Sequence, residues 1–336
     1  MPAARQPDRP LASGKLPLDL LAQLLADVPS PPEVRLGAGI GEDACAIEVP
    51  EGVLVVAADP ITLTSEEIAR LAVIVNANDV AVTGARPQWF LAVVLVPPAT
   101  GEGVVRELFA ALQSSLFALG AFLVGGHTEV TPAVNRPIVV GQMLGMAQNG
   151  IVATGGFAPG DVLVQVRPAP IEGAAVLARE AGDRLQSVEA PMQEAARIAL
   201  DDPGISVVEP ALLATRLGGK ALHDPTEGGL AGGLHEMASA AGVGISVDRE
   251  AVLWFEPGLA VCKALDADPW STLASGTLLA AFAPGAVDEA LAAFARHGHL
   301  AAGIGTAVTG SGVEDGEGVA IPWNEQDEVA RLLSVD

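Results

Sequence analysis

One acidic residue inside an apolar helical pattern constrains this chain more than any other feature. Residues 76–87 read NANDVAVTGARP and close a predicted helix, with Thr64 as its expected N-cap and Glu67 as the partner in a capping box. At 100° per residue, Asp79 projects within about 20° of Ile68, in the middle of the apolar stripe. Burying an unpaired carboxylate costs several kcal/mol, so Asp79 requires a hydrogen-bonded partner, a cation or a solvent-lined cavity.

Two polar neighbours extend this feature along the helix. Asn76 lies one turn before Asp79 and Thr83 one turn after it, which gives a polar strip on the helix surface. The alternative is that this end of the helix meets water and Asp79 is simply solvated. The helix alone does not decide between the two readings.

Further acids follow strand-like or glycine-rich segments. Residues 53–58 form a continuous apolar run that leads into Asp59 and Pro60, and α/β proteins commonly bind ligands at the carboxyl ends of strands. A turn aspartate before proline is equally compatible with this pattern. Asp43 lies in GAGIGEDAC, residues 37–45, which is neither a dinucleotide fingerprint nor a P-loop because the last glycine and the GK[ST] are missing.

Two glycine-rich motifs stand later in the chain. Residues 125–131, GGHTEVT, follow a short predicted strand, and paired glycines allow a ligand to approach the backbone. Asp224 opens DPTEGGLAGGLHE, where Gly228 and Gly229 fall in the first turn of a predicted helix. Glycine there costs helix stability, so we expect these residues to admit a ligand or another backbone at an N-terminus that favours anions. A loosely packed surface helix is the alternative.

Bulk properties exclude several classes of function. The formal charge of −23 opposes binding to a phosphate backbone, so we expect no nucleic-acid partner. No apolar run reaches the roughly 18 residues that span a bilayer, and the N-terminal residues do not resemble a signal peptide, so no membrane association is expected. Cys45 and Cys262 are far apart and fit neither a zinc site nor a disulfide framework, which favours a reducing cytoplasm.

The order of predicted strands and helices indicates two domains. We divide the chain into an N-terminal extension with a short helix at 1–34, a first domain at 35–150, a second domain at 151–312 and an exposed tail at 313–336. If Asp43, Asp59, Asp79 and Asp224 converge, they repel one another until a divalent cation joins them. Hard oxygen ligands favour Mg²⁺, which is held by a few carboxylates together with substrate phosphates.

The order of the motifs resembles the AIR synthase (PurM-like) superfamily of ATP-binding proteins. GxDA, a strand that ends in Asp, NxxDxxxxGAxP, GGxTxV and DPTxGGL occur in sequence over about residues 35–310. DPTEGGLAGGLHEMA and LASGTLLAAF are most similar to the branch of the hydrogenase maturation factor HypE and its AIR-synthase-related relatives. The resemblance implies an α+β fold of two domains, in which paired N-terminal sheets form a barrel across a homodimer interface and the C-terminal domain is α/β.

The resemblance also implies a set of site residues for ATP and Mg²⁺. Asp79 and Asp59 are the expected catalytic residues. The expected nucleotide-binding residues are Asp43, Asn76, Gly125, Gly126, His127, Thr128 and Gly228. The expected metal ligands are Asp43, Asp59, Asp79, Glu129 and Asp224.

Two departures from the family pattern bear on the activity. Relatives often carry an acid directly after the paired glycines, where this chain has His127, so either Glu129 compensates or one metal position is lost. HypE ends in a cysteine that receives the carbamoyl group, whereas this sequence ends in ARLLSVD. We therefore expect an enzyme that uses Mg-ATP to phosphorylate or activate an oxygen of a small polar substrate. The alternative is a nucleotide-binding maturation or scaffold protein that acts through a protein partner without turnover.

Overall fold

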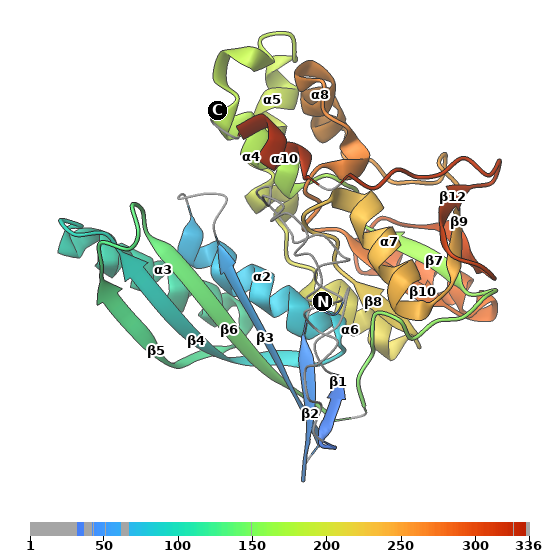
Figure 1. Ribbon diagram of the computed structural model, residues 1–336, viewed down its shortest axis with the longest axis horizontal. Helices are drawn as coiled ribbons and strands as arrows, with labels where there is room; N and C mark the ends of the chain where they lie inside the picture. Colours follow the sequence, from blue (N-terminus) through green and yellow to red (C-terminus); the bar gives the residue numbers. More distant parts are fainter. Residues whose placement is uncertain are drawn as a thin grey trace, which may run out of the picture.

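The computed structural model describes residues 32–36, 42, 44–50, 52–61, 67–148, 150–324 and 326–333. They form two six-stranded sheets with their helices, and the two halves of the chain lie side by side around helix α2 (Figure 1). Asp43, Thr64 and the helix predicted over residues 17–28 lie outside the described residues. The architecture is the predicted α+β arrangement.

The first sheet is built from residues 34–147 in the order β1-β2-β3-β6-β4-β5. Its neighbours are antiparallel except β4 and β5, which are parallel because helix α3 connects them as a crossover. The strands are β1 (Val34–Leu36), β2 (Cys45–Val49), β3 (Gly52–Ile61), β4 (Arg86–Val96), β5 (Phe122–Val130) and β6 (Ile138–Ala147).

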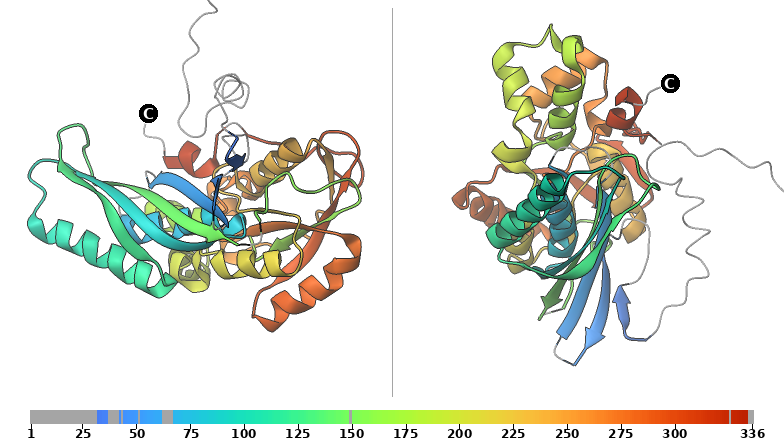
Figure 2. Two further views of the ribbon diagram at one scale, coloured as in Figure 1. Left: turned by 90° about the horizontal axis from the view of Figure 1, so that it is seen from below. Right: turned by 90° about the vertical axis from the view of Figure 1, so that its left-hand side faces the viewer.

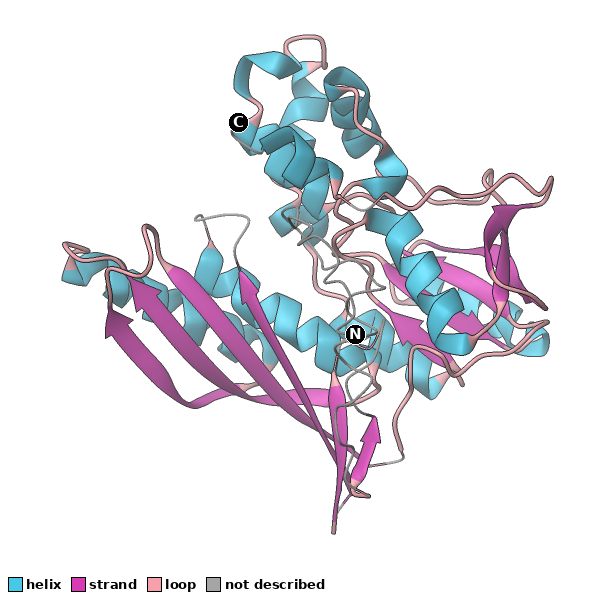
Figure 3. Cartoon of the chain, in the orientation of Figure 1, coloured by secondary structure: helices cyan, strands magenta, loops and turns pink. Residues whose placement is uncertain are grey.

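Helices α2 (Ile68–Val82) and α3 (Glu102–Leu119) cover one face of this sheet (Figure 3). Along β4 and β6, buried residues alternate with half-buried ones, as expected for a sheet with only one face packed on a core. The face turned to the viewer in Figure 1 carries no described helix. Within one chain the described sheet is open, so the predicted barrel is not closed by this chain alone.

Helix α2 is buried on nearly all sides, because it lies between the first sheet and the second domain. Every residue of α2 except Arg70 and Ile74 is buried. One core cluster joins Val80 and Ala81 to residues of both sheets, and another joins Leu71 to Ile205 of the second domain. The predicted role of Glu67 is wrong, since this residue is the N-cap, in a left-handed conformation without a side-chain cap bond. Its carboxylate instead pairs with Arg179 of α4 (Glu172–Glu180) at 2.8 Å.

The second sheet has the order β12-β9-β11-β7-β10-β8, and only β12 and β9 are parallel. Its strands are β7 (Val162–Val166), β8 (Ala221–His223), β9 (Gly244–Val247), β10 (Leu278–Phe282), β11 (Ala301–Val308) and β12 (Gly312–Asp315). The central strands β7 and β10 and the edge strand β8 have almost uniformly buried residues, as expected for strands covered on both faces.

Seven helices belong to the described part of the second half. α4, α5, α8 and α10 gather at the top of Figure 1 around a small apolar core of their own. The remaining bounds are α5 (Ala190–Arg197), α6 (Val208–Arg216), α7 (Gly229–Ala241), α8 (Glu256–Leu265), α9 (Val287–Arg296) and α10 (Glu328–Leu333). Short helical turns are η1 (Gly182–Leu185), η2 (Leu200–Gly204), η3 (Pro269–Ser271) and η4 (Pro284–Ala286).

The segment after residue 311 is not an exposed tail, and that prediction is wrong for its described part. β12 pairs with β9, and Val313, Ile321 and Val329 are buried. The Trp323 ring stacks on His235 of α7 at a centroid distance of 5.4 Å. Figure 2 shows this segment lying against the second domain (red). None of the described helices combines the length and apolar character needed to cross a bilayer.

Candidate functional site

Asp59 is held by the side chain of Asn76. The Asn76 Oδ1 atom accepts a hydrogen bond from the Asp59 N–H at 2.8 Å, and its Nδ2 atom donates to the Asp59 carbonyl at 3.1 Å. Nδ2 also donates to the Ala72 carbonyl at 2.9 Å, which fixes the amide against its own helix. Asp59 lies inside β3, whose ladder extends to Ile61, so the turn alternative is wrong. Its side chain remains exposed.

A glycine makes room for this contact. Gly141 of β6 is the register partner of Asp59, and a Cβ atom added there would lie 2.4 Å from Asn76 Nδ2 and 2.8 Å from Phe90 Cζ. Pro60 follows in the part of β3 that pairs with β6 but no longer with β2. The β3–β6 pair is thus shaped to admit the Asn76 amide.

Asp79 is only 6% exposed, so the solvated alternative is wrong. It lies three residues after Asn76, about 60° away around the helix, and therefore on the side of α2 that adjoins the end of β3. α2 also contacts β8, the strand that ends next to Asp224. Helix α2 therefore adjoins both segments that carry the other described candidate aspartates, Asp59 and Asp224.

Asn78 is a residue that the sequence analysis missed. It is fully buried, its Nδ2 atom donates to the Ile205 carbonyl at 2.9 Å, and its Oδ1 atom accepts from the Val207 N–H at 2.8 Å. An asparagine inside a continuous apolar helix was the available signal, because such a residue must find hydrogen-bond partners when buried. The helical pattern alone did not indicate which segment would provide them.

The GGHTE motif lies in the edge strand β5. Gly125, Gly126, His127, Thr128 and Glu129 are all exposed there, and His127 Nε2 lies 3.6 Å from Glu129 Oε2. Gly126 has φ 143°, and a Cβ atom on it would fall 2.0 Å from the Ala92 carbonyl oxygen. The glycine is therefore required by the close β4–β5 pairing, whether or not a ligand binds.

The register places this motif away from Asp59 within one chain. Asp59 pairs with Gly141, Gly141 with Ala92, and Ala92 with Gly126, which forms one row across four strands. Three strand spacings separate the ends of the row by about 14 Å. The structure thus brings Asp59 and Asn76 together, whereas Glu129 lies on β5, three strands away from β3.

In the second domain, Asp224 directly follows β8 and is 1% exposed. Its neighbour His223 is also buried, and His223 Nε2 lies 2.9 Å from Glu236 Oε2 of α7. Asp224 and this pair lie where β8 leads into the glycine-rich turn before α7. Asp224, the residue expected to be the metal ligand of the second domain, is thus buried.

The N-terminus of α7 already binds a carboxyl group from this chain. The Gly228 N–H donates to Asp327 Oδ2 at 2.9 Å, and the Val329 N–H donates to Asp327 Oδ1 at 2.8 Å. A Cβ atom on Gly229 would lie 2.4 Å from the Trp270 carbonyl oxygen. Gly229 therefore admits another backbone segment, as expected, while the Gly228 N–H is bonded within this chain by Asp327.

Two buried acids near this helix have raised pKa values. Burial raises the pKa of Glu172 to about 7, and the nearby Glu227 and Asp327 carboxylates add to the shift against a hydrogen bond from Ser275. Burial likewise raises the pKa of Asp327 to about 7, although its two backbone N–H donors oppose the shift. Glu172 begins α4, Glu227 precedes α7 and Asp327 precedes α10, so this acidic group lies within the packing of the second domain.

Among the residues with assigned positions, no three His, Cys, Asp or Glu side chains are arranged to hold a metal ion. Asp43, the remaining predicted ligand, lies outside them. The donor chemistry nevertheless fits Mg²⁺, because Asp59 and Asp79 supply hard carboxylate oxygens and Mg²⁺ usually completes its shell with water and phosphate. This fit to Mg²⁺ rests on the chemical type of the Asp59 and Asp79 side chains.

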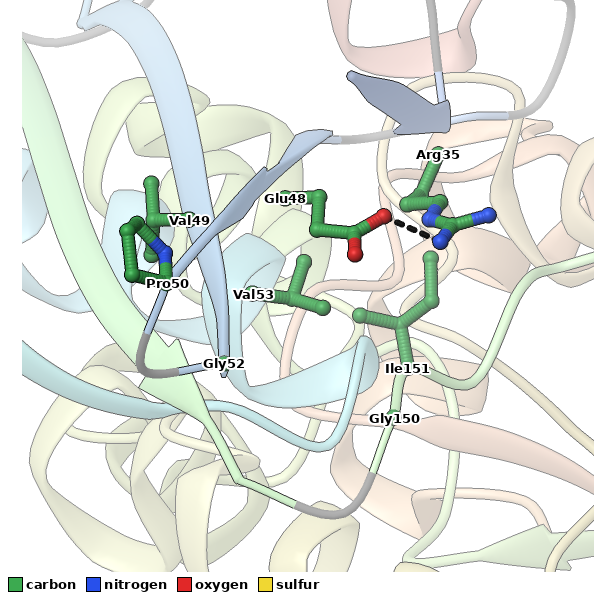
Figure 4. A pocket seen from close by; sticks show the side chains of 8 residues that line it. All are labelled: Arg35, Glu48, Val49, Pro50, Gly52, Val53, Gly150 and Ile151. Carbon is green, nitrogen blue, oxygen red and sulfur yellow. Dashed lines mark ion pairs between the residues drawn. The ribbon is translucent and has the colours of Figure 1, made fainter. Parts of the chain in front are cut away.

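An open pocket of about 560 Å³ lies at the other end of β3 (Figure 4). Gly52, Val53 and Ile151 line it together with the ion pair between Arg35 and Glu48. Gly52 is seven residues from Asp59 along an extended strand, which is roughly 23 Å. The pocket is therefore separate from the candidate aspartates.

The family of this chain follows from comparisons with known proteins. Residues 41–147 match the N-terminal domain and residues 158–315 the C-terminal domain of AIR synthase related protein. The chain belongs to the AIR synthase related family, as the order of its motifs predicted. The family defines a PurM-like fold with two domains.

The relatives include proteins of hydrogenase maturation. Carbamoyl dehydratase HypE of Rhodobacter capsulatus is 29% identical over 316 residues, which cover 91% of this chain and 88% of that relative. HypE of Azotobacter vinelandii is 30% identical over 280 residues, covering 79% of this chain and 78% of that relative.

Solved structures share the fold at lower sequence identity. A HypE in complex with ATP superimposes with a TM-score of 0.72 at 21% identity, covering 95% of this chain and 98% of that one. The HypE–HypF complex gives 0.73 at 21% identity, covering 91% and 99%. A ThiL complexed with AMPPCP and TMP gives 0.72 at 17% identity, covering 92% and 94%.

Proposed function

We propose that this chain is a Mg²⁺-dependent enzyme that uses ATP to phosphorylate or activate an oxygen of a small polar substrate and releases ADP. The observation that carries the proposal is the double hydrogen bond between Asn76 and Asp59, one helical turn from the buried Asp79. The relatives support it, since a HypE was solved with ATP and a ThiL with AMPPCP, both on this fold.

In this proposal Asp59 and Asp79, together with Asp43, hold the metal and the phosphates, while Asn76 orients the strand that carries Asp59. Bound Mg²⁺ would neutralise phosphate charge during transfer, as in phosphoryl transfer generally. Asp224 would approach from the second domain. Gly125, Gly126, His127 and Thr128 would contact the nucleotide, and Gly228 is left out because its N–H already bonds Asp327.

A homodimer would bring the GGHTE motif to a second copy of the site. β5 is an edge strand, and its Phe122, Val124 and Val130 side chains are 67%, 55% and 64% exposed. Exposed apolar edge strands are stable mainly when covered, and a second β5 can pair along this edge. Glu129 and His127 would then act from the partner chain. We place the protein in the cytoplasm, because Cys45 and Cys262 are free thiols.

Replacing Asp79 by Asn tests the proposal. The change keeps the shape of the side chain and removes the charge, so Mg-ATP binding measured by calorimetry should be lost while the circular dichroism spectrum is retained. Asp288→Asn, on the exposed first turn of α9, is the matched control and should bind like wild type. If Asp79→Asn bound Mg-ATP as tightly as wild type, Asp79 would not be a ligand of the metal or the phosphates.

The second candidate is a nucleotide-binding maturation or scaffold protein that acts on a protein partner without turnover. The observation that favours it is the HypE–HypF complex, in which a protein of this fold binds a partner protein. ADP release from purified protein with Mg-ATP separates the two candidates. Tight ATP binding with no ADP release across a panel of small polar acceptors would favour the scaffold.

A further inference from the structure

Asn78 joins α2 to the second domain through both polar atoms of its amide. It donates to the Ile205 carbonyl at 2.9 Å and accepts from the Val207 N–H at 2.8 Å, in a fully buried environment. The amide thus pairs with one backbone carbonyl and one backbone N–H of this segment, as the backbone of a neighbouring β-strand would. Only one orientation of the amide makes both bonds.

The segment that Asn78 contacts, residues 200–207, is here called the junction segment. From α2, Arg70 donates to the Leu200 carbonyl at 2.5 Å and to Asp201 Oδ1 at 2.7 Å. From the end of β7, Arg167 donates to the Ser206 carbonyl at 2.7 Å. The same guanidinium donates to the carbonyls of Pro203 and Gly204 at 2.6 and 2.5 Å. The junction segment is therefore fixed from both domains.

The two asparagines of α2 act on different sides of the helix. Asn76 bonds the backbone of β3, and Asn78 projects about 200° further around the axis, toward the junction segment. Asp79 projects between them, about 60° from Asn76 and 100° from Asn78. Hydrogen bonds on nearly opposite sides leave the helix little freedom to rotate, so they set the direction in which Asp79 points.

We infer that Asn78 is a positioning residue of the candidate site: by locking the junction segment to α2, it sets the second domain and its Asp224 against Asp79 and Asp59. The residue touches no nucleotide in this scheme and acts through Asp79. The inference rests on the proposed function for the identity of the ligand. Its structural part, the lock between α2 and the junction segment, stands on the hydrogen bonds alone.

Replacing Asn78 by Ala removes both bonds of the lock. Alanine neither donates to the Ile205 carbonyl nor accepts from the Val207 N–H, so both backbone groups lose their partner in a buried environment. The change adds no charge beside Asp79, so a loss of nucleotide affinity would not be an effect of added charge.

Hydrogen exchange at the Val207 amide, corrected for intrinsic rates, directly measures whether residue 78 protects this N–H. In Asn78→Ala we expect exchange faster than in wild type by about tenfold or more, because the Val207 N–H loses its acceptor. Thr83→Val is the matched control, since Thr83 is buried on the same helix and bonds only the Val80 carbonyl within it, at 2.7 Å.

Mg-ATP affinity, measured where the variants are fully folded, separates positioning from simple stabilisation. Asn78→Ala should bind Mg-ATP at least tenfold more weakly than wild type, while Thr83→Val should bind like wild type. Wild-type affinity in Asn78→Ala despite fast Val207 exchange would overturn the inference and leave the proposed function intact. If wild-type protein itself bound no Mg-ATP, the proposed function would fall and the positioning role with it.

Discussion

Asn76 and Asp59 are joined by two hydrogen bonds in which a helix side chain pairs with the backbone of a strand. The Asn76 amide lies over the β3–β6 ladder at the point where Gly141 leaves space for it. Removing the amide leaves the Asp59 N–H without this acceptor and frees the end of β3. This relationship makes the position of Asp59 depend on a residue of α2.

Asn76→Ala should lower both stability and nucleotide affinity. Loss of buried hydrogen-bond partners costs about 1–3 kcal/mol in the free energy of unfolding. Chemical denaturation measures that loss, and calorimetry with Mg-ATP measures the second effect. Asn135→Ala, at an exposed position between β5 and β6, should change neither quantity.

Gly141→Ala should mimic part of that effect without touching a polar atom. The new Cβ would lie 2.4 Å from Asn76 Nδ2, so the amide must move, at a cost of about 1–3 kcal/mol in stability. Gly103→Ala in α3 is the matched control, because no heavy atom lies within 4 Å of its Cβ position. There we expect a gain of about 0.5–1 kcal/mol from higher helix propensity. Equal melting temperatures for the two variants would contradict this account.

Glu172 should make stability depend on pH between about 4.5 and 7. Its pKa is raised from 4.5 to about 7 in the folded protein, so the folded state holds more protons than the unfolded chain in this window. The free energy of unfolding must then fall as pH rises, by up to about 1.4 kcal/mol per pH unit for each such group. Glu172→Gln should flatten the profile measured by denaturation at several pH values. The exposed Glu194→Gln should retain the wild-type slope.

Asp327→Ala should uncap α7 and loosen the C-terminal segment. The Gly228 N–H loses its acceptor, and removal of an N-terminal helix cap costs about 1 kcal/mol. Hydrogen exchange at Gly228 should accelerate, and the fluorescence of Trp323, stacked on His235, should change. Glu107→Ala, an exposed acid on α3, provides the comparison. Unchanged exchange at Gly228 would show that the cap contributes nothing.

Val124→Lys should dissociate the proposed homodimer. The change places a charge at an exposed apolar position of the edge strand β5, where a second chain would pair. Analytical ultracentrifugation should then show a lower mass than wild type at the same concentration. Phe117→Lys provides the control, because Phe117 is 87% exposed but lies on α3 and not on the strand. A monomeric wild-type protein would contradict the dimer.

Local patterns predicted most elements, because periodicity and glycine positions are local properties. The strand that leads into Asp59 and the helix that contains Asp79 follow such patterns. Contacts between distant segments could not be predicted in the same way. The bond from Gly228 to Asp327 spans 99 positions and that from Asn78 to Val207 spans 129, and neither leaves a local signature. Local patterns singled out the candidate aspartates and the family resemblance gave them their roles, whereas the partners of Asn78 required the structure.

Helix α2 contributes residues to apolar clusters that draw on both halves of the chain. A fragment cut in the linker near residue 150 would therefore expose one flank of its central helix to water. Such a fragment would have to cover that flank of α2 by binding another molecule or by aggregating. The two halves are thus one cooperative folding unit despite their separate sheets, and shuffling either half between relatives would require exchanging the matching flank of α2 as well.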